Sequence, residues 1–477
     1  MPQICFKYAR SLLFKGFCRP VSGSCIFSVL LTLTFLLVVE AFKVLRWKSM
    51  RVLVKSYGCS TNLADGAVLA GCLARAGYAL AGSIADADVV VLNACAVKGP
   101  TEDRMIEVAK RVPLGKKLIV AGCLPLINFA RLQREVRFEG AAGPAVGEGI
   151  VQVVGRVLSG ERVCVVNEDP GVNPGLFLPR VDVNSVVSIV PICYGCLGSC
   201  AYCCVVFARG RLRSYGVDEI GRRVEADVGR GFREVWLTAQ DTACYGRDIG
   251  TNLVNLLRCV CRVDGDFKVR VGMMTPSLVL GMLDGVVDTF RNEKVFKFLH
   301  LPVQSGDDRV LKRMRRFYSA ADFKMIVDKF RVSFPELTLA TDVICGFPGE
   351  SEEAFAGTLD LLQEVKVDIV NVSKFFARPG TRAAGMQKDF VAAGEVKRRS
   401  ARAGALAKKL AFERNKRWVG WRGEVLIDEV GKVSGSWVGR NFAYKPVALR
   451  SAESLLGKTV RVEIVDAFLT FLEGKLV

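Results

Sequence analysis

Residues 191–215 read PICYGCLGSCAYCCVVFARGRLRSY and contain Cys196, Cys200 and Cys203 at the spacing C-x3-C-x2-C. A loop this short presents three thiolates to three irons of a 4Fe-4S cluster and leaves the fourth iron free for the amino and carboxylate groups of S-adenosylmethionine. The alternative is a zinc ribbon that adds Cys193. Zinc pairs usually stand about 15–20 residues apart, whereas only three residues separate Cys196 from Cys200. The spacing therefore favours a cluster, with Cys204 as a packing thiol on the opposite side.

Six candidate strands begin at this motif and continue after it, each followed by helical or polar sequence. They are VVSIVPIC (186–193), REVWLTAQD (233–241), FKVRVGMM (267–274), KFLHLPVQ (297–304), LATDVICGF (339–347) and DIVNVSKFF (368–376). Hydrophobic strands that alternate with helices form parallel sheets, so six units predict an incomplete (βα)6 barrel over residues 180–395.

Polar residues stand at the ends of these strands, where barrels bind ligands. We expect these side chains to face the mouth of the barrel: Gln240, Asp241, Thr275, Gln304 and Asp342. His300 lies late in the fourth strand, where packing or a hydrogen bond is favoured over a role as catalytic base.

The segment before the motif also alternates strand and helix. RVLVKSYG, ADVVVLNAC and KKLIVAGC read as strands with helical periodicity between them, which predicts a Rossmann-like domain over residues 50–165. Cys59, Cys95 and Cys123 each follow a strand, and parallel strands end along one edge of a sheet, so we expect these thiols to converge. Three thiolates suit a second iron–sulfur cluster better than structural zinc, which usually takes four ligands. The alternative is separate buried thiols, as expected for Cys72.

The C-terminal part begins with a basic helical stretch. Residues 391–417 hold nine Lys+Arg and two Glu, and we assign 396–417 as a linker. Glycine-separated alternating segments then predict a small β-barrel over 418–477, a type of fold that binds looped RNA. GRNFAYKPV interleaves Arg440, Phe442, Tyr444 and Lys445, which suits phosphate contact and base stacking. The alternatives are a solvated helix face and aromatic side chains that point into the barrel core.

Composition narrows the function further. The chain has 477 residues, 17 cysteines, one histidine and a net charge of +19. One histidine almost excludes histidine metal sites and Ser-His-Asp catalysis, so the chemistry falls to cysteine or to a cofactor. So large a chain is not a small disulfide scaffold, and its thiols favour a reducing, cytoplasmic location. The positive charge indicates nucleic acid as a partner, with solubility as the alternative.

The N-terminal segment 1–49 has two interpretations. Residues 20–39 are uncharged and long enough to span a bilayer as a membrane tether. Alternatively, translation starts at Met50, directly before the first strand. Without residues 1–49 the chain loses seven basic residues and one acid and remains basic.

The motifs in this order resemble the radical-SAM methylthiotransferase family over residues 51–477. GCSTN at Cys59, NAC at Cys95 and GC at Cys123 look like its N-terminal cluster motif, GCLGSCAYC looks like its radical-SAM motif, and the tail resembles its RNA-binding TRAM domain. LTAQDTACYGRDIG, RVGMM, HLPVQSGDDRVLKRMRR, TDVICGFPGE and GRNFAYKPV are most similar to the archaeal and eukaryotic branch, which acts on N6-threonylcarbamoyladenosine beside the tRNA anticodon. The sequence departs from relatives at Ser60-Thr61 and Ala94, which are not expected ligands.

The resemblance implies a transferase that methylthiolates C2 of N6-threonylcarbamoyladenosine at tRNA position 37. The cluster on Cys196, Cys200 and Cys203 would reduce S-adenosylmethionine to methionine and a 5′-deoxyadenosyl radical, which activates C2. The second 4Fe-4S cluster would hold or supply sulfur, and a second S-adenosylmethionine would supply the methyl group.

The remaining expectations concern contacts and partners. We expect these residues to contact S-adenosylmethionine: Tyr202, Gln240, Gln304 and Asp342. We expect these to contact RNA, with surface charge as the alternative: Arg209, Arg211, Arg213, Arg440, Tyr444 and Lys445. The implied partners are the tRNA anticodon loop, an electron donor and a sulfur donor. The rival substrates are isopentenyladenosine in tRNA and a ribosomal-protein aspartate. The rival class is a non-enzymatic iron–sulfur or zinc protein that binds RNA.

Overall fold

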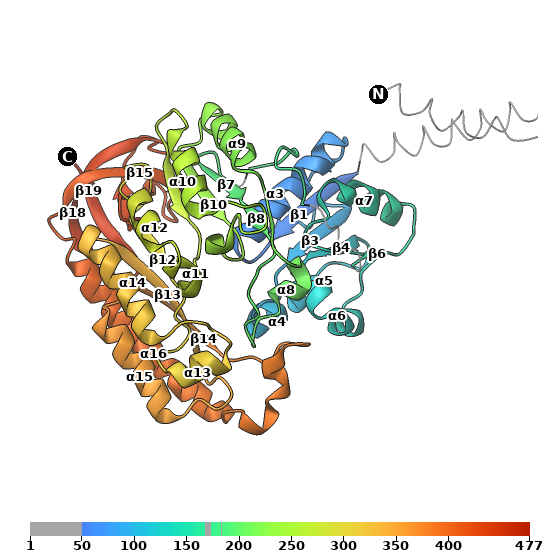
Figure 1. Ribbon diagram of the computed structural model, residues 1–477. Coiled ribbons are helices and arrows are strands. Elements are labelled where there is room, and N and C mark those ends of the chain that lie inside the picture. The colour runs from blue at the N-terminus through green and yellow to red at the C-terminus, as the bar shows by residue number, and fades with distance from the viewer. Residues whose placement is uncertain (1–49, 167–172, 183) are drawn as a thin grey trace, which may run out of the picture. The chain divides into compact units, whose positions relative to one another are not determined.

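The computed structural model describes residues 50–166, 173–182 and 184–477 (Figure 1). The apolar stretch 20–39, the candidate membrane tether, lies outside these residues. Among the helices that the structure describes, none combines the length and apolar character needed to cross a bilayer.

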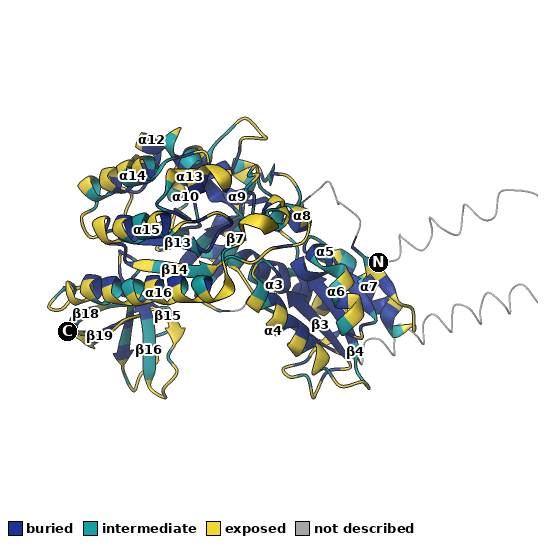
Figure 2. Ribbon diagram, turned by 90° about the horizontal axis from the view of Figure 1, so that it is seen from below, coloured by how far each residue is buried: buried dark blue, intermediate teal, exposed yellow. Residues whose placement is uncertain are grey.

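The N-terminal domain is built on a six-stranded parallel sheet with the order β2-β1-β3-β4-β5-β6. The central strand β3 reads VVVLNA and is buried along its whole length, as expected for a parallel strand covered on both faces (Figure 2). This sheet confirms the predicted Rossmann-like fold. Its strands are β1 (Arg51–Ser56), β2 (Ala79–Leu80), β3 (Val89–Ala94), β4 (Lys117–Gly122), β5 (Gly140–Ala142) and β6 (Val163–Val165). Its helices are α3 (Ser60–Arg75), α4 (Gly99–Lys110), α5 (Cys123–Ile127), α6 (Phe129–Glu135) and α7 (Ile150–Leu158).

The middle domain consists of six parallel strands in two three-stranded sheets, β7-β10-β11 and β12-β13-β14. The sheets meet where Val269 N donates to Lys294 O at 2.6 Å and Phe296 N donates to Val269 O at 3.0 Å. The predicted incomplete barrel is therefore confirmed, with β7 and β14 as its edges. The strands are β7 (Val187–Pro191), β10 (Glu234–Thr238), β11 (Lys268–Val271), β12 (Phe298–His300), β13 (Thr338–Cys345) and β14 (Ile369–Lys374).

Helices cover the outside of this partial barrel. In α10 the apolar side chains recur at helical spacing, so Leu253, Leu256, Leu257 and Val260 are buried against the barrel. The side chain of Asn252 caps this helix by accepting from Asn255 N at 3.1 Å. The helices are α9 (Val217–Gly229), α10 (Leu253–Arg262), α11 (Pro276–Leu280), α12 (Leu283–Thr289), α13 (Asp308–Arg313), α14 (Ala320–Ser333) and α15 (Glu352–Glu364).

The C-terminal part begins with the basic helix α16 (Ala393–Lys416), which leads into a closed five-stranded barrel of order β15-β16-β17-β19-β18. The barrel surrounds an apolar core that includes Val425, Val447, Val462 and Leu472. This confirms the predicted small β-barrel. Its strands are β15 (Arg422–Val430), β16 (Ser436–Arg440), β17 (Pro446–Arg450), β18 (Thr459–Ala467) and β19 (Leu472–Leu476).

Candidate functional site

The loop of Cys196, Cys200 and Cys203 is closed at its base by a two-stranded ribbon, β8 (Cys193–Tyr194) and β9 (Arg213–Ser214). Within the loop, Cys203 N donates to Cys200 O at 3.1 Å. Burial raises the pKa of the Cys203 thiol, and its two partner thiols lie near enough to add to this. All three thiols are partly exposed. The structure therefore brings the predicted trio together on one loop.

Gly198 leaves space beside two of these sulfurs. A Cβ atom on Gly198 would lie 3.2 Å from Cys196 Sγ and 3.6 Å from Cys200 Sγ. Gly198 N donates to Cys196 Sγ at 3.2 Å, and Arg316 Nη1 donates to Cys200 Sγ at 3.2 Å. Both groups donate to sulfur, and the cysteine sulfur that binds iron is a thiolate. These residues fit a cluster.

The described cysteines do not form a site for a single metal ion. Among the described residues, no three Cys, His, Asp or Glu side chains are placed to hold one metal ion. Structural zinc needs four ligands on one ion, whereas each thiolate of a 4Fe-4S cluster binds a different iron. Cys204 does not join the trio, because it is buried in the apolar core of the N-terminal domain, as expected for a packing thiol.

Cys59, Cys95 and Cys123 lie after the neighbouring strands β1, β3 and β4. The register pairs Ser56 with Asn93 and Ala94 with Gly122, so the three strands end at one edge. Cys59 is exposed and the other two thiols are buried. Burial raises the pKa of Cys123 to about 12, and Cys95 and Cys59 also act on this thiol. The structure brings this trio together too.

Gly58, which precedes Cys59, leaves room for the side chain of Cys95. Its φ is +119°, and an added Cβ would lie 2.5 Å from Cys95 Cβ and 3.1 Å from Cys95 Sγ. A residue with a side chain would therefore be strained and would also displace Cys95.

The short helix α8 (Val205–Arg209) carries the cysteine loop into the N-terminal domain. Ala208 belongs to the apolar core of that domain, and Arg209 is only 3% exposed. Arg209 Nη2 donates to Asp65 Oδ2 at 2.7 Å and to Asn62 Oδ1 at 3.2 Å. The predicted RNA contact of Arg209 is therefore wrong, because the buried guanidinium is directed at the protein interior.

The other basic residues of this motif remain nearer the surface. Arg211 is exposed, and Arg213 is partly buried, with Nε donating to Asn173 Oδ1 at 3.3 Å. Both stay predicted RNA contacts.

In the C-terminal barrel, Lys445 is buried, with Nζ donating to Asp368 Oδ1 and Asn415 Oδ1, each at 2.9 Å. Tyr444 packs its ring on Phe296 at a centroid distance of 4.8 Å. The predicted RNA contact at Lys445 is therefore wrong, because its buried side chain anchors the barrel to the middle domain. Tyr444 is partly exposed, and its RNA contact stays a prediction.

Two neighbouring residues of this segment are placed differently. Arg440 is largely covered, and its Nε donates to Asp428 Oδ2 at 3.0 Å. Phe442 is exposed, so one of the two aromatic residues of the motif points inward and the other does not.

The residues predicted to contact S-adenosylmethionine lie at different places in the middle domain: Gln240 and Gln304 just after β10 and β12, Asp342 within β13, and Tyr202 in the cysteine loop. Asp342 Oδ2 pairs with His300 Nε2 at 2.7 Å; burial opposes the charge of Asp342, but this contact lowers its pKa. His300 is thus hydrogen-bonded, as expected. Gln304 has φ of 70° and donates from its backbone N to Asp342 O at 2.8 Å. The Oε1 atom of Gln240 is buried without a hydrogen-bond partner, which suits an acceptor awaiting a ligand donor.

Tyr202 and Asp241 complete this region. The Tyr202 ring packs edge-on against Phe347, with centroids 6.4 Å apart. Asp241 is buried and accepts from Ala243 N at 3.0 Å and Thr275 N at 3.1 Å. Burial raises the pKa of Asp241. Asp241 therefore holds the loop at the end of β10 in place.

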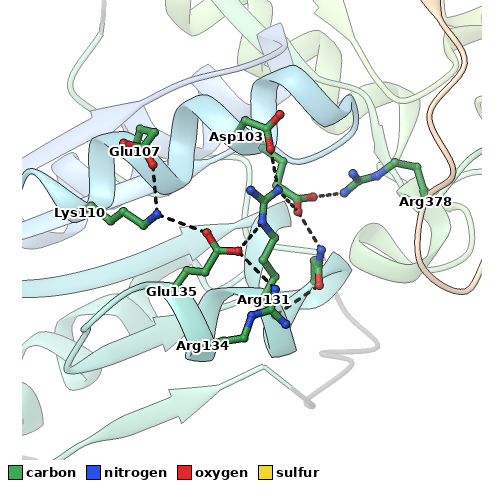
Figure 3. A network of polar contacts seen from close by, with 9 residues as sticks. Asp103, Glu107, Lys110, Arg131, Arg134, Glu135 and Arg378 are labelled. Carbon is green, nitrogen blue, oxygen red and sulfur yellow. Dashed lines mark hydrogen bonds and ion pairs between the residues drawn. The ribbon is translucent and has the colours of Figure 1, made fainter. Parts of the chain in front are cut away.

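A network of ion pairs joins the N-terminal domain to the segment after β14 (Figure 3). Glu102 of α4 is buried, and its carboxylate accepts from Arg378, from Arg131 Nη1 at 3.0 Å and from Asn128 Nδ2 at 2.8 Å. Arg378 also acts on Cys204. The network ties the β14 exit to the domain that carries Cys95.

Sequence reasoning missed several residues around the thiols: Asn62, Asp65, Glu102, Arg316 and Arg378. Each acts on a partner far away along the chain; 144 positions separate Arg209 from Asp65, for example. For the four charged residues the only sequence signal was the charge, which a surface residue carries equally, and Asn62 gave no signal.

Comparisons with known families divide the chain into three parts. Residues 51–140 match the uncharacterized protein family UPF0004, residues 190–362 the radical SAM superfamily, and residues 416–477 the TRAM domain.

Curated relatives match along nearly the whole described chain. A Pyrococcus abyssi protein called "Probable threonylcarbamoyladenosine tRNA methylthiotransferase" is 40% identical over 428 residues, which is 89% of this chain and 99% of the relative. The human threonylcarbamoyladenosine tRNA methylthiotransferase is 36% identical over 434 residues, 89% of this chain and 74% of the relative.

Solved structures support the fold. A radical S-adenosylmethionine methyltransferase, TsrM from Kitasatospora setae, with tryptophan substrate and a SAM analogue bound, superposes with a TM-score of 0.52 at 14% identity and covers 70% of this chain and 75% of its own. A second structure of TsrM, with cobalamin and a [4Fe-4S] cluster bound, gives a TM-score of 0.51 at 13% identity over 82% of this chain and 80% of its own.

Proposed function

This chain belongs to the threonylcarbamoyladenosine tRNA methylthiotransferase family, and from this premise we propose that it methylthiolates C2 of N6-threonylcarbamoyladenosine at position 37 of tRNA. The observation that carries the proposal is that α8 joins the two cysteine trios. It follows Cys203 in the sequence and packs into the apolar core that contains Cys123. Sulfur transfer needs the site that activates the substrate and the site that holds sulfur to be fixed relative to each other.

The cofactors of this function are S-adenosylmethionine and two 4Fe-4S clusters, held by Cys196, Cys200 and Cys203 and by Cys59, Cys95 and Cys123. When bound, they supply reductive cleavage of S-adenosylmethionine and a source of sulfur. Radical chemistry is required because an aromatic C–H bond is too inert for acid–base chemistry. Gly198 leaves room between two of the sulfurs. Gln240, after β10, offers an acceptor without a hydrogen-bond partner. The hydrogen-bonded pair of His300 and Asp342 offers further polar atoms on β12 and β13.

The partner of this function is tRNA, and we propose the anticodon loop as the part that enters the barrel mouth. Arg211 is exposed two residues beyond Arg209 and can meet a phosphate. Electron and sulfur donors are further partners, and tRNA as substrate fits a cytoplasmic location. Replacing Arg211 by Ala should make the fall of log affinity with log salt less steep, by about one unit of slope. An unchanged slope would remove Arg211 from the interface.

The function is tested by anaerobic reconstitution followed by nucleoside analysis. The full chain should bind about eight iron and eight sulfide atoms, and it should convert threonylcarbamoyladenosine in tRNA to its 2-methylthio derivative in mass analysis. A chain with Cys59, Cys95 and Cys123 changed to Ala should bind about half the iron, still cleave S-adenosylmethionine and form no product. Cys72→Ala, which changes a buried thiol within α3, is the matched control.

The rival assignments give different outcomes in the same experiment. Methylthiolated isopentenyladenosine or a modified ribosomal protein would replace the proposed substrate. A failure to cleave S-adenosylmethionine by the reduced, iron-loaded chain would overturn the enzymatic assignment in favour of a binding protein.

A further inference from the structure

Arg209 follows the loop of Cys196, Cys200 and Cys203 in the sequence, but in the structure it lies in the domain of Cys59, Cys95 and Cys123. It ends α8, six residues after Cys203. Helix α8 packs on α5, which begins with Cys123, and Ala208 lies in the same apolar core as Cys123. The side chain that follows the radical-SAM motif therefore reaches the N-terminal thiols.

The guanidinium is held in place by neighbours of the N-terminal trio. Asp65 accepts from Arg209 Nη2 at 2.7 Å and from Tyr194 Oη at 2.5 Å. Asn62 accepts from the same Nη2, and its own Nδ2 donates to Tyr57 O at 2.6 Å and Asn93 O at 3.1 Å. The Arg209 guanidinium also lies over the Tyr194 ring, 5.6 Å from its centroid. These contacts leave the guanidinium little freedom.

One nitrogen of this buried group has no partner. Arg209 Nη1 is buried and makes no hydrogen bond with the protein. An unpaired buried donor is costly unless something accepts from it. The thiols of Cys59, Cys95 and Cys123 are the neighbours on which Arg209 acts electrostatically.

The charge of Arg209 is preserved despite burial. Burial opposes the charged form, and the Asp65 carboxylate, which accepts from Nη2 at 2.7 Å, compensates the buried charge. Three thiolates of which two are buried repel one another, and a fixed cation beside them offsets part of that repulsion. Charge and hydrogen bonds to sulfur are also what set the reduction potential of an iron–sulfur cluster.

We propose that Arg209 is a positioning residue for the N-terminal cluster: from the radical-SAM loop it directs Nη1 toward the sulfurs at Cys59, Cys95 and Cys123, and Asp65 balances its charge. The proposal rests on the proposed function only in that it assigns a cluster to this trio. It goes further by making the reduction potential of one site depend on a residue delivered by the loop of the other.

The test measures the midpoint potential of the N-terminal cluster by redox titration followed by electron paramagnetic resonance. The full chain carries Cys196, Cys200 and Cys203 changed to Ala, so that the N-terminal cluster alone contributes. Arg209→Gln removes the cation and should lower the ratio of reduced to oxidised cluster at fixed potential at least tenfold, which is about 59 mV for one electron. Arg209→Lys, which keeps the charge without the planar fork, should give a smaller shift in the same direction.

Asp65→Asn is the decisive second variant. It removes a negative charge and leaves Arg209 in place, so the cluster should become easier to reduce and the potential should rise. Opposite signs in Arg209→Gln and Asp65→Asn separate an electrostatic role from a structural one, because loss of packing would disturb both variants alike. Arg134→Gln, an exposed arginine of the same domain whose side chain is 71% accessible, is the matched control and should leave the potential unchanged.

Potentials that match the control, or shifts of equal sign in the two variants, would overturn the proposal. If Arg209→Gln binds no N-terminal cluster, the sign of the Asp65→Asn shift alone decides: a rise supports the proposal and a fall or no change refutes it. Formation of 5′-deoxyadenosine by Arg209→Gln with all six cysteines present should stay within twofold of the control. A wild-type chain that forms no methylthio product would overturn the proposed function and leave the potential shifts to stand independently.

Discussion

Lys445 in the C-terminal barrel donates from Nζ to Asp368 Oδ1 at 2.9 Å, although 77 positions separate the two residues. Asp368 is fully buried just before β14, and Arg414 of α16 donates from Nε to the same oxygen at 3.0 Å. Burial opposes ionisation of Asp368, but Lys445 and Arg414 outweigh it and lower its pKa. One carboxylate therefore joins the middle domain, the basic helix and the C-terminal barrel.

Lys445→Met should destabilise this junction. Removing one partner of a buried ion pair costs about 3–5 kcal/mol, and we expect the lower end because Arg414 remains. The measurement is the urea midpoint at which the C-terminal barrel unfolds. Lys458→Met, at an exposed position of the same barrel, is the control. Equal midpoints for the two variants would show that Lys445 does not support the junction.

Glu234 should make stability depend on pH. Burial, and then repulsion by Asp428, raises its pKa to about 7, whereas a glutamate in the unfolded chain has a pKa of about 4.3. The folded state thus keeps its proton longer, and the free energy of unfolding falls as the pH rises between these values and is level above about 7.

Glu234→Gln should remove this slope, so that relative to wild type the variant gains stability, by up to about 3 kcal/mol, between pH 5 and pH 8. Urea unfolding at the two pH values measures the difference. Glu424→Gln, an exposed glutamate of β15, provides the control, and a gain that is independent of pH would contradict the explanation.

Gly58→Ala should disrupt the N-terminal cysteine site. The added Cβ would lie 2.5 Å from Cys95 Cβ in a backbone conformation with φ of +119°, and such strain costs about 1–3 kcal/mol. Iron per reconstituted chain should fall to about half of the wild-type value. Gly82→Ala has no atom within 4 Å of the new Cβ and should bind iron normally. Full iron loading of Gly58→Ala would show that Gly58 is not needed for the N-terminal cysteine site.

Arg316→Met should slow the first chemical step. Arg316 is buried, and its Nη1 donates to Cys200 Sγ at 3.2 Å while its Nε donates to Tyr318 Oη at 3.1 Å. A hydrogen bond from a charged group contributes about 1.5–3 kcal/mol, so formation of 5′-deoxyadenosine under reducing conditions should fall at least about tenfold. Arg315→Met alters the exposed neighbouring residue and should retain the wild-type rate. Equal rates in the two variants, at equal iron content, would exclude this role.

The barrel strands and the cysteine positions were predictable because their signals are local. The run KLIVAG followed by Cys123 reads as a buried strand with a thiol at its end, and parallel strands bring their ends to one edge whatever the rest of the chain does. The role of Lys445 was misread, because a basic residue among aromatic residues suits an RNA surface and an interdomain contact equally well.

The sequence by itself determined the two cysteine trios, the three folds that carry them and the family to which the motifs point. The trios and the folds follow from spacing and periodicity, which are properties of short segments, and the family follows from the resemblance of the motifs. Only the tertiary structure decided that Arg209 is buried against Asp65 of the N-terminal domain and that Lys445 is buried. A charged side chain is rarely buried unless it is paired with an opposite charge. Here the opposite charges, Asp65 and Asp368, come from distant parts of the chain.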